Sequence, residues 1–152
     1  MTNIIYSVKR SKMNFRRWHQ DIKGIGGLNY ILFQNVPMRE SQGEAVIEIN
    51  ELILKELAAR AIIERRLPIR GMEVKFLRKT LGLSMEEFSE QLGLTSGAIF
   101  KWEHKAEERL HPINEIAVRS LIADHLELEI SGRFSKLISD DITPHELILQ
   151  AG

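Results

Sequence analysis

Hydrophobic and polar positions along the chain predict a β-rich first part. The segment LNYILFQNV, residues 28–36, is rich in β-branched and aromatic residues, and EAVIEIN, residues 44–50, alternates between apolar and polar positions. Both patterns are typical of strands. Pro37 and Gly43 mark the connection between the two segments, so we expect a β-hairpin.

An amphipathic helix is predicted next, over residues 51–66. Asn50 is a suitable N-cap for this helix. Its apolar residues recur on one broad face: Ile53, Leu54, Leu57, Ala58, Ala61 and Ile62. Pro68 ends the helix, because proline cannot continue a helix and disfavours helical backbone at the preceding residue. We place a domain boundary here.

From Gly71 onward the pattern becomes helical. A first helix is expected over residues 72–82. Ser84 caps a second helix, and Glu87, three residues later, completes a capping box. Gly93 supplies the left-handed residue that ends this second helix.

Two further helices complete this region. Thr95 caps a third helix, which reaches about His104. Pro112 lies in the first turn of a fourth helix, expected over residues 111–128, and is favoured at that position. The segment SGRF, residues 131–134, ends the helical region.

The end of the chain, residues 134–150, is predicted to form one or two short helices, the last of them starting at Thr143–Pro144. In a chain this short, apolar residues near the end indicate either dimer packing or closure of the core, and both interpretations stay open. The residues concerned are Phe134, Leu137, Ile138, Ile142, Leu147, Ile148 and Leu149.

Composition limits the possible functions. The chain has 152 residues, of which 43% are hydrophobic and 28% charged, so it can bury a core in one domain or two small ones. It has no cysteine, and its histidines show no tight spacing; we therefore expect no disulfide, no metal and no cofactor. No Ser/His/Asp arrangement supports an enzyme. No apolar run has the length of a membrane span and no signal-peptide pattern opens the chain, so we expect a cytoplasmic protein.

Charge is balanced overall but uneven along the chain. Residues 1–69 carry 11 basic and 7 acidic residues, whereas residues 70–130 carry 8 and 11. The basic excess lies mainly in VKRSKMNFRRWHQDIK, residues 8–23, for which three interpretations stay open: a solvated tail, an arm on the DNA backbone, or a segment that contacts a protein partner. GIGG, residues 24–27, is expected to be a turn, since no Lys-Ser/Thr follows as in a phosphate loop.

The stretch SMEEFSEQLGLTSGAIFKWE, residues 84–103, has the properties of a helix-turn-helix. Gly93 suits the turn, and a small residue, Ser89, suits the contact between two steeply crossing helices. Apolar residues suited to the inward faces are Val74, Leu77, Leu81, Phe88, Leu92, Leu94 and Ile99. If Ile99 points inward, the base-contacting positions are Ser96, Gly97, Phe100 and Lys101.

Residues 76–103 resemble the Xre/Cro family of helix-turn-helix regulators, whose domain is a lambda repressor-like helical bundle. The resemblance rests on LGLS at 81–84, Ser89, Gly93, Ile99 and Trp102–Glu103, which occur together in register. It implies that Ser96, Gly97 and Lys101 contact bases, with Phe100 between them in contact with either the groove or a partner.

The same resemblance implies contacts to DNA phosphates and one structural pair. Arg78 is expected to contact phosphate and to pair with Glu103, while Trp102 is expected to lie in the core. Further phosphate contacts are expected from Ser84, Thr95, His104 and Lys105. The glutamine that commonly follows Ser84 in the family is replaced by Met85.

A wider resemblance covers GGLNYILFQNV, EAVIEINELILKELAARAIIERR and LPIRGMEVKFLRKTLGLSMEEFSEQLG, which together look like the MqsA-type antitoxins. It implies a homodimer that binds operator DNA, neutralises a ribonuclease-type toxin and represses its own operon. Because the chain has no cysteine, it resembles zinc-free relatives of the group. A stand-alone phage- or plasmid-type repressor is the alternative.

We therefore expect a mixed α+β protein, mainly α. It comprises a basic arm (1–27), a β-hairpin-plus-helix module that binds the toxin (28–68), a helix-turn-helix DNA-binding domain (69–130) and a C-terminal helical extension (131–152). The expected partners are double-stranded operator DNA, a cognate toxin and a second copy of the chain.

Overall fold

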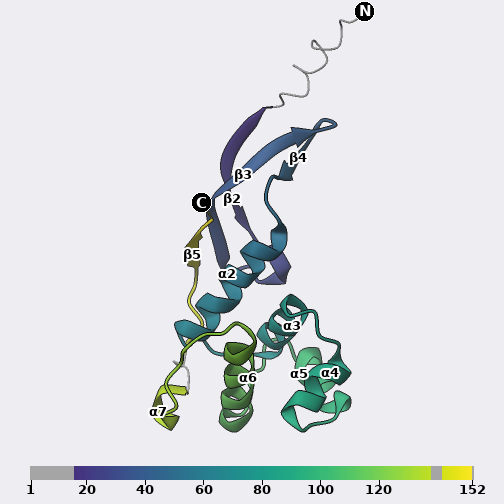
Figure 1. Cartoon of the computed structure of the whole chain (residues 1–152), viewed down its shortest axis with the longest axis vertical. Helices are drawn as coiled ribbons and strands as arrows, with labels where there is room; N and C mark the ends of the chain where they lie inside the picture. Colours follow the sequence, from purple (N-terminus) through teal and green to yellow (C-terminus); the bar gives the residue numbers. More distant parts are fainter. Residues whose placement is uncertain (1–15, 138–141, 152) are drawn as a thin grey trace, which may run out of the picture.

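The computed structural model describes residues 16–137 and 142–151. It shows a mixed α+β protein in which a twisted sheet forms one end and a group of helices the other, as Figure 1 shows. Residues 8–15 of the basic segment lie outside the described residues. Helix α2 (Glu51–Glu64) extends from the sheet to the helices and packs against both.

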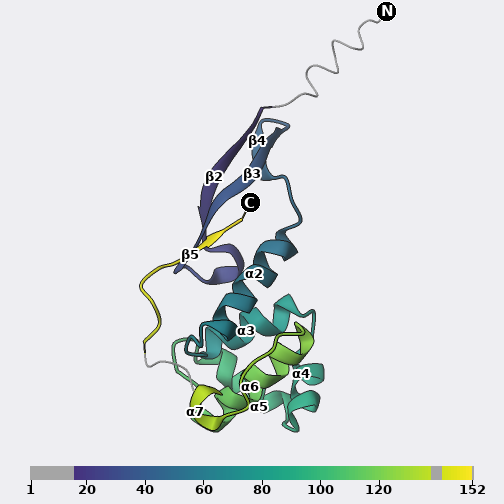
Figure 2. The ribbon, with the colours of Figure 1, turned by 60° about the vertical axis from the view of Figure 1, so that its left-hand side comes forward.

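The sheet is built around one long strand, β3 (Ile31–Ser41). Strand β2 (Arg17–Lys23) pairs antiparallel with one edge of β3. The other edge is shared: β4 (Glu44–Ile47) pairs antiparallel with the outer half of β3, and β5 (Leu147–Gln150) pairs parallel with the inner half. Figure 2 shows the chain returning to the sheet from the helices to form β5.

The hairpin is confirmed, but its boundaries differ from the prediction. Residues 37–41 belong to strand β3 and are not part of the connection, which is the turn at Gln42 and Gly43. Pro37 lies within the strand although it has no N–H to donate. Its carbonyl still takes part in pairing, since it accepts a hydrogen bond from the Glu48 N–H at 2.9 Å. Asn35, with φ of 60°, interrupts the pairing of β2 with β3 as a bulge.

The basic segment was expected as an arm, yet its residues 17–23 form the edge strand β2. The short turn η1 (Ile25–Gly27) follows, as GIGG predicts. Arg17 pairs with Glu48 at 2.5 Å and Lys23 pairs with Glu146 at 2.8 Å. Two cations of the basic segment are thus paired with carboxylates that lie next to strands β4 and β5.

Helix α2 begins at the predicted N-cap, where the Asn50 side chain accepts a hydrogen bond from the Leu52 N–H. Its buried face contains Leu54, Ala58, Ala61 and Ile62, as expected, but Ile53 is exposed. The core continues through Leu67 and Ile69, so residues on both sides of Pro68 share one hydrophobic cluster.

The helices that follow are α3 (Gly71–Thr80), α4 (Met85–Leu92), α5 (Ser96–His104), α6 (Pro112–His125) and α7 (Phe134–Leu137). Ser84 and Thr95 cap α4 and α5 with their side chains, and Gly93 has the left-handed conformation after α4. These local predictions are confirmed. The expected helix starting at Thr143–Pro144 is wrong, because the chain forms strand β5 instead and buries Leu147 and Leu149 against the sheet.

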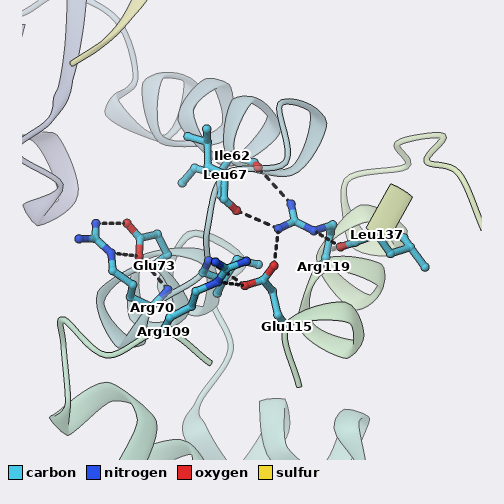
Figure 3. A network of polar contacts seen from close by, with 9 residues as sticks. Ile62, Leu67, Arg70, Glu73, Arg109, Glu115, Arg119 and Leu137 are labelled. Atoms are coloured by element: carbon cyan, nitrogen blue, oxygen red, sulfur yellow. Dashed lines mark hydrogen bonds and ion pairs between the residues drawn. The ribbon is translucent and has the colours of Figure 1, made fainter. Parts of the chain in front are cut away.

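Two buried polar networks connect the helices with α2 and the sheet, as Figure 3 shows for the residues drawn. The first joins Arg70 to Glu73, and Tyr30 adds a hydrogen bond to Glu73 at 2.9 Å. In the second, Glu115 accepts from Arg109 and Arg119, and Arg119 also donates to the carbonyls of Ile62, Ile63, Leu67 and Leu137. At the end of α2, Arg119 thereby adds a second donor to the Ile62 and Ile63 carbonyls, which also accept from the Leu67 and Arg66 N–H groups.

Candidate nucleic-acid interface

The four residues expected to contact bases lie together on the solvent side of α5. Ser96, Gly97, Phe100 and Lys101 are all exposed. Gly97, Phe100 and Lys101 follow Ser96 by one, four and five residues, and this spacing places all four on one face of the helix. Phe100, which is 56% exposed, is a large apolar group on this otherwise polar face.

The opposite side of α5 is fixed by packing. Ile99 is fully buried and Trp102 is half-buried against the core. Gly71 permits the close approach of α3, because a Cβ at this position would lie 2.0 Å from the Trp102 carbonyl oxygen. The Gly71 and Met72 N–H groups donate to the carbonyls of Glu108 and Ala106 in the segment after α5. The exposed face of α5 is therefore held in a defined position.

The N-termini of α4 and α5 differ in their capacity to bind an anion. At α5 the Thr95 side chain accepts a hydrogen bond from the Ala98 N–H at 3.2 Å, but the first turn has no acidic residue, so the helix dipole there is open to a phosphate. At α4 the Glu87 carboxylate accepts a hydrogen bond from the Ser84 N–H at 2.8 Å. Hydrogen bonds from the Ser84 backbone and side chain lower the pKa of Glu87. This carboxylate occupies a position where a phosphate would bind, so the geometry favours Thr95 over Ser84 as a phosphate contact.

Arg78 pairs with Glu103, as the resemblance implies. Its Nε and Nη2 donate to the Glu103 carboxylate at 2.7 and 2.9 Å, and its Nη1 donates to the Leu83 carbonyl at 2.8 Å. The hydrogen bond with Glu103 raises the pKa of Arg78. Because the side chain is only 8% exposed and all three of its nitrogens have partners within the protein, we assign Arg78 a structural role and withdraw the expected phosphate contact.

The C-terminal end of α5 presents the two remaining predicted residues. His104 and Lys105 are exposed, and the His104 ring stacks on Phe100 with centroids 5.7 Å apart. Lys105 forms an ion pair with Glu108 at 3.7 Å, in which both side chains are exposed. Such a pair is weak, so it leaves Lys105 available to a phosphate.

Three residues that sequence reasoning missed lie beside this face. A hollow of about 470 Å³ is bordered by Gly97 and Lys101 on one side and by Arg109, His111 and Asn114 on the other. The chain returns past α5 after residue 104 and places these polar groups there. Arg109 lies in the loop between α5 and α6, His111 is the N-cap of α6 and Asn114 lies in its first turn; their polar character in the sequence does not reveal that they lie beside α5.

The acidic excess of residues 70–130 does not lie entirely on the surface. Of its 11 acidic residues, Glu73 and Glu115 are buried and the Glu103 side chain is 4% exposed. All three pair with arginines. Each of these pairs removes one positive charge together with one negative charge, so the excess of acidic over basic residues in the segment remains on its other side chains.

No helix within the described residues is long and apolar enough to cross a membrane. No protein family, curated protein or solved structure matches the chain in comparisons with known proteins.

Proposed function

We propose that the protein is a sequence-specific DNA-binding repressor of the Xre/Cro helix-turn-helix type and that α5 is its recognition helix. The observation that carries this proposal is the exposed polar start of α5 over the buried Ile99. An α-helix with this arrangement fits the major groove of B-DNA, where base edges present their distinguishing donors and acceptors.

Each residue of the face has a specific role in this proposal. The Lys101 ammonium donates to the O6 and N7 acceptors of a guanine, and the Ser96 hydroxyl contacts a neighbouring base edge. Gly97 lets the helix approach closely because it has no side chain. Phe100 packs against a thymine methyl group, while Thr95, His104 and Lys105 contact phosphates on either side of the groove.

The proposal includes a homodimer. One short recognition helix contacts only about 3–5 base pairs, so two copies on symmetric half-sites are needed for useful discrimination. The partner in this assembly is a second copy of the chain.

The resemblance to MqsA-type antitoxins extends the proposal to neutralisation of a ribonuclease-type toxin. The sheet and α2 would form the toxin-binding part. In support, α2 exposes two neighbouring apolar residues, Leu52 and Ile53, which are 41% and 51% exposed and suit a protein interface. The alternative, a stand-alone repressor, uses the same α5 contacts and lacks the toxin.

Selection of duplexes from a random pool, followed by gel-shift titration, tests the DNA-binding proposal. Wild-type protein should enrich a two-fold symmetric site, and Lys101→Ala should weaken binding to it by about 1–3 kcal/mol. Lys136→Ala, on exposed α7, is the matched control and should bind as wild type does. Enrichment of no site, or wild-type affinity in Lys101→Ala, would contradict the proposal.

Co-expression separates the antitoxin from the stand-alone repressor. The product of the reading frame adjacent to the gene should co-purify with the tagged chain and should inhibit growth when expressed without it. A neighbouring product that does not bind and does not inhibit growth would support the stand-alone repressor.

A further inference from the structure

A second candidate site lies where the sheet end of the molecule meets the helices. A cavity of about 430 Å³ opens between η1, the start of α2 and one side of α3. This volume is in the range of small-molecule sites in proteins. Glu103, near the C-terminal end of α5, and Ala106, just after that helix, also border the cavity. Ser96 and Gly97 lie at the opposite end of α5, so the cavity is separate from the face assigned to base contacts.

Positive charge dominates the lining. Lys55, Lys75 and Lys79 all border the cavity. Lys75 and Lys79 are exposed and form no ion pair or hydrogen bond through their ammonium groups with the described residues, while Lys55 has an ion pair with Glu51 at 3.3 Å. The acidic lining residue, Glu103, is already neutralised by Arg78.

The cavity also has an unsatisfied buried polar group beside it. Thr80 borders the cavity and is 7% exposed, and its Oγ1 has no hydrogen-bond partner among the described residues. Buried polar atoms almost always have a partner, and leaving one unpaired destabilises the folded protein. This oxygen has almost no accessible surface, so it lies behind the cavity wall and is not itself a ligand for the cavity contents.

The remaining wall is apolar. Leu28, Met72 and Phe76 border the cavity, and Gly26 lets the loop lie close against the Phe76 ring. A Cβ at position 26 would be 2.4 Å from Phe76 Cε1. The site therefore offers three ammonium groups next to an apolar surface.

We propose that this cavity binds a small phosphorylated molecule whose phosphate lies among the lysines and whose apolar part packs against Phe76. Several ammonium groups around one cavity favour a dianion over a monocarboxylate, and lysine is a common phosphate ligand. DNA phosphates carry the same chemistry, so the test distinguishes the two sources. The proposal does not depend on the repressor function.

Isothermal titration of the full-length chain with phenyl phosphate tests the proposal, because this compound combines a phosphate dianion with one aromatic ring. Saturable binding at one site per chain is expected, with weaker binding of inorganic phosphate and of benzyl alcohol. Replacing both Lys75 and Lys79 by alanine should weaken phenyl phosphate binding about tenfold or more, whereas Lys136→Ala should not change it.

Thr80→Val provides an independent variant that preserves side-chain shape. It should raise the melting temperature of the free protein, because the unpaired hydroxyl is removed, and it should leave phenyl phosphate binding unchanged, because the hydroxyl oxygen is not accessible from the cavity. Absence of saturable binding, or unchanged affinity in the double lysine variant, would overturn the proposal. If the double variant loses affinity for duplex DNA while wild-type protein does not bind phenyl phosphate, the lysines contact the DNA backbone and the proposal is wrong.

Discussion

Arg78 and Glu103 form an ion pair that is almost entirely removed from solvent, with side-chain exposures of 8% and 4%. Removing one partner of such a pair leaves an uncompensated buried charge, which costs far more than the pair contributes. The sequence resemblance predicted this pair correctly. It did not show that the third nitrogen of Arg78 is also engaged, because that depends on where the Leu83 carbonyl lies.

Arg78→Met should therefore lower the free energy of unfolding by about 3–5 kcal/mol in urea titrations, because Glu103 stays buried and charged. The double variant Arg78→Met, Glu103→Met should recover most of that loss and should bind operator DNA as wild type does. Loss of DNA affinity in the stable double variant would restore the phosphate contact to Arg78.

The partly buried Tyr30 side chain makes the stability of the protein depend on pH. Burial, together with the negative charge of Glu73, raises the pKa of Tyr30 well above the 10 of an exposed tyrosine. Only the unfolded chain then loses this proton near pH 10, so the contribution to stability is complete below pH 10 and declines as the pH rises above it.

Absorbance at 295 nm in a Tyr6→Phe background measures this titration, because Tyr30 is then the remaining tyrosine. The folded protein should show no tyrosinate signal at pH 10–11. In Tyr30→Phe the decline of the free energy of unfolding above pH 10 should be reduced. A titration midpoint near 10 in the folded protein would contradict the buried contact with Glu73.

At the scale of elements, the predictions that succeeded rest on local signals. The caps at Ser84 and Thr95 and the left-handed Gly93 depend on residues within one helical turn, so the sequence was sufficient. Strand β2 was missed because, as an exposed edge strand with a polar composition, it has little apolar alternation. Strand β5 was missed because its pairing with β3 joins opposite ends of the chain, and such tertiary pairing overrides local propensity.

Gly71→Ala tests the packing of α3 against α5. The added Cβ would collide with the Trp102 carbonyl, so a loss of about 1–3 kcal/mol in the free energy of unfolding is expected. Gly132→Ala is the matched control, since a Cβ there meets no atom within 4 Å. Equal stability of the two variants would show that the helices are not in close contact at this position.

At the scale of the whole molecule, the end of the chain contributes to the shared core. Leu147 and Leu149 are each 5% exposed, and the sheet, α2 and the helices contribute to one continuous hydrophobic cluster. For the described residues, the structure supports closure of the core by this segment. Ile142 at 78% and Phe134 at 62% remain exposed, so dimer packing through them stays a prediction.

Leu149→Ala should lower the free energy of unfolding by about 2–5 kcal/mol, as expected for a buried leucine. Ile148→Ala is the control on the same strand, because Ile148 is 45% exposed and its truncation should have a small effect. Urea denaturation measures both. A small effect of Leu149→Ala would mean that β5 does not stabilise the sheet in solution.

The candidate interface was predictable where helical periodicity decides which face is exposed, as for Ser96 and Lys101. It was not predictable where the path of the chain in space decides, as for Arg109 and His111, which reach α5 only because the following loop returns beside it. The balance of charge at the surface also required the structure, since it depends on which carboxylates are buried.

The most direct test of the central claim is the change in backbone amide chemical shifts when the selected operator duplex is added to the isotopically labelled full-length chain. If α5 is the recognition helix, the largest changes are expected at Ser96, Gly97, Phe100 and Lys101, with little change on strands β3 and β4. Changes confined to the sheet, or none on α5 at saturating duplex, would contradict this assignment.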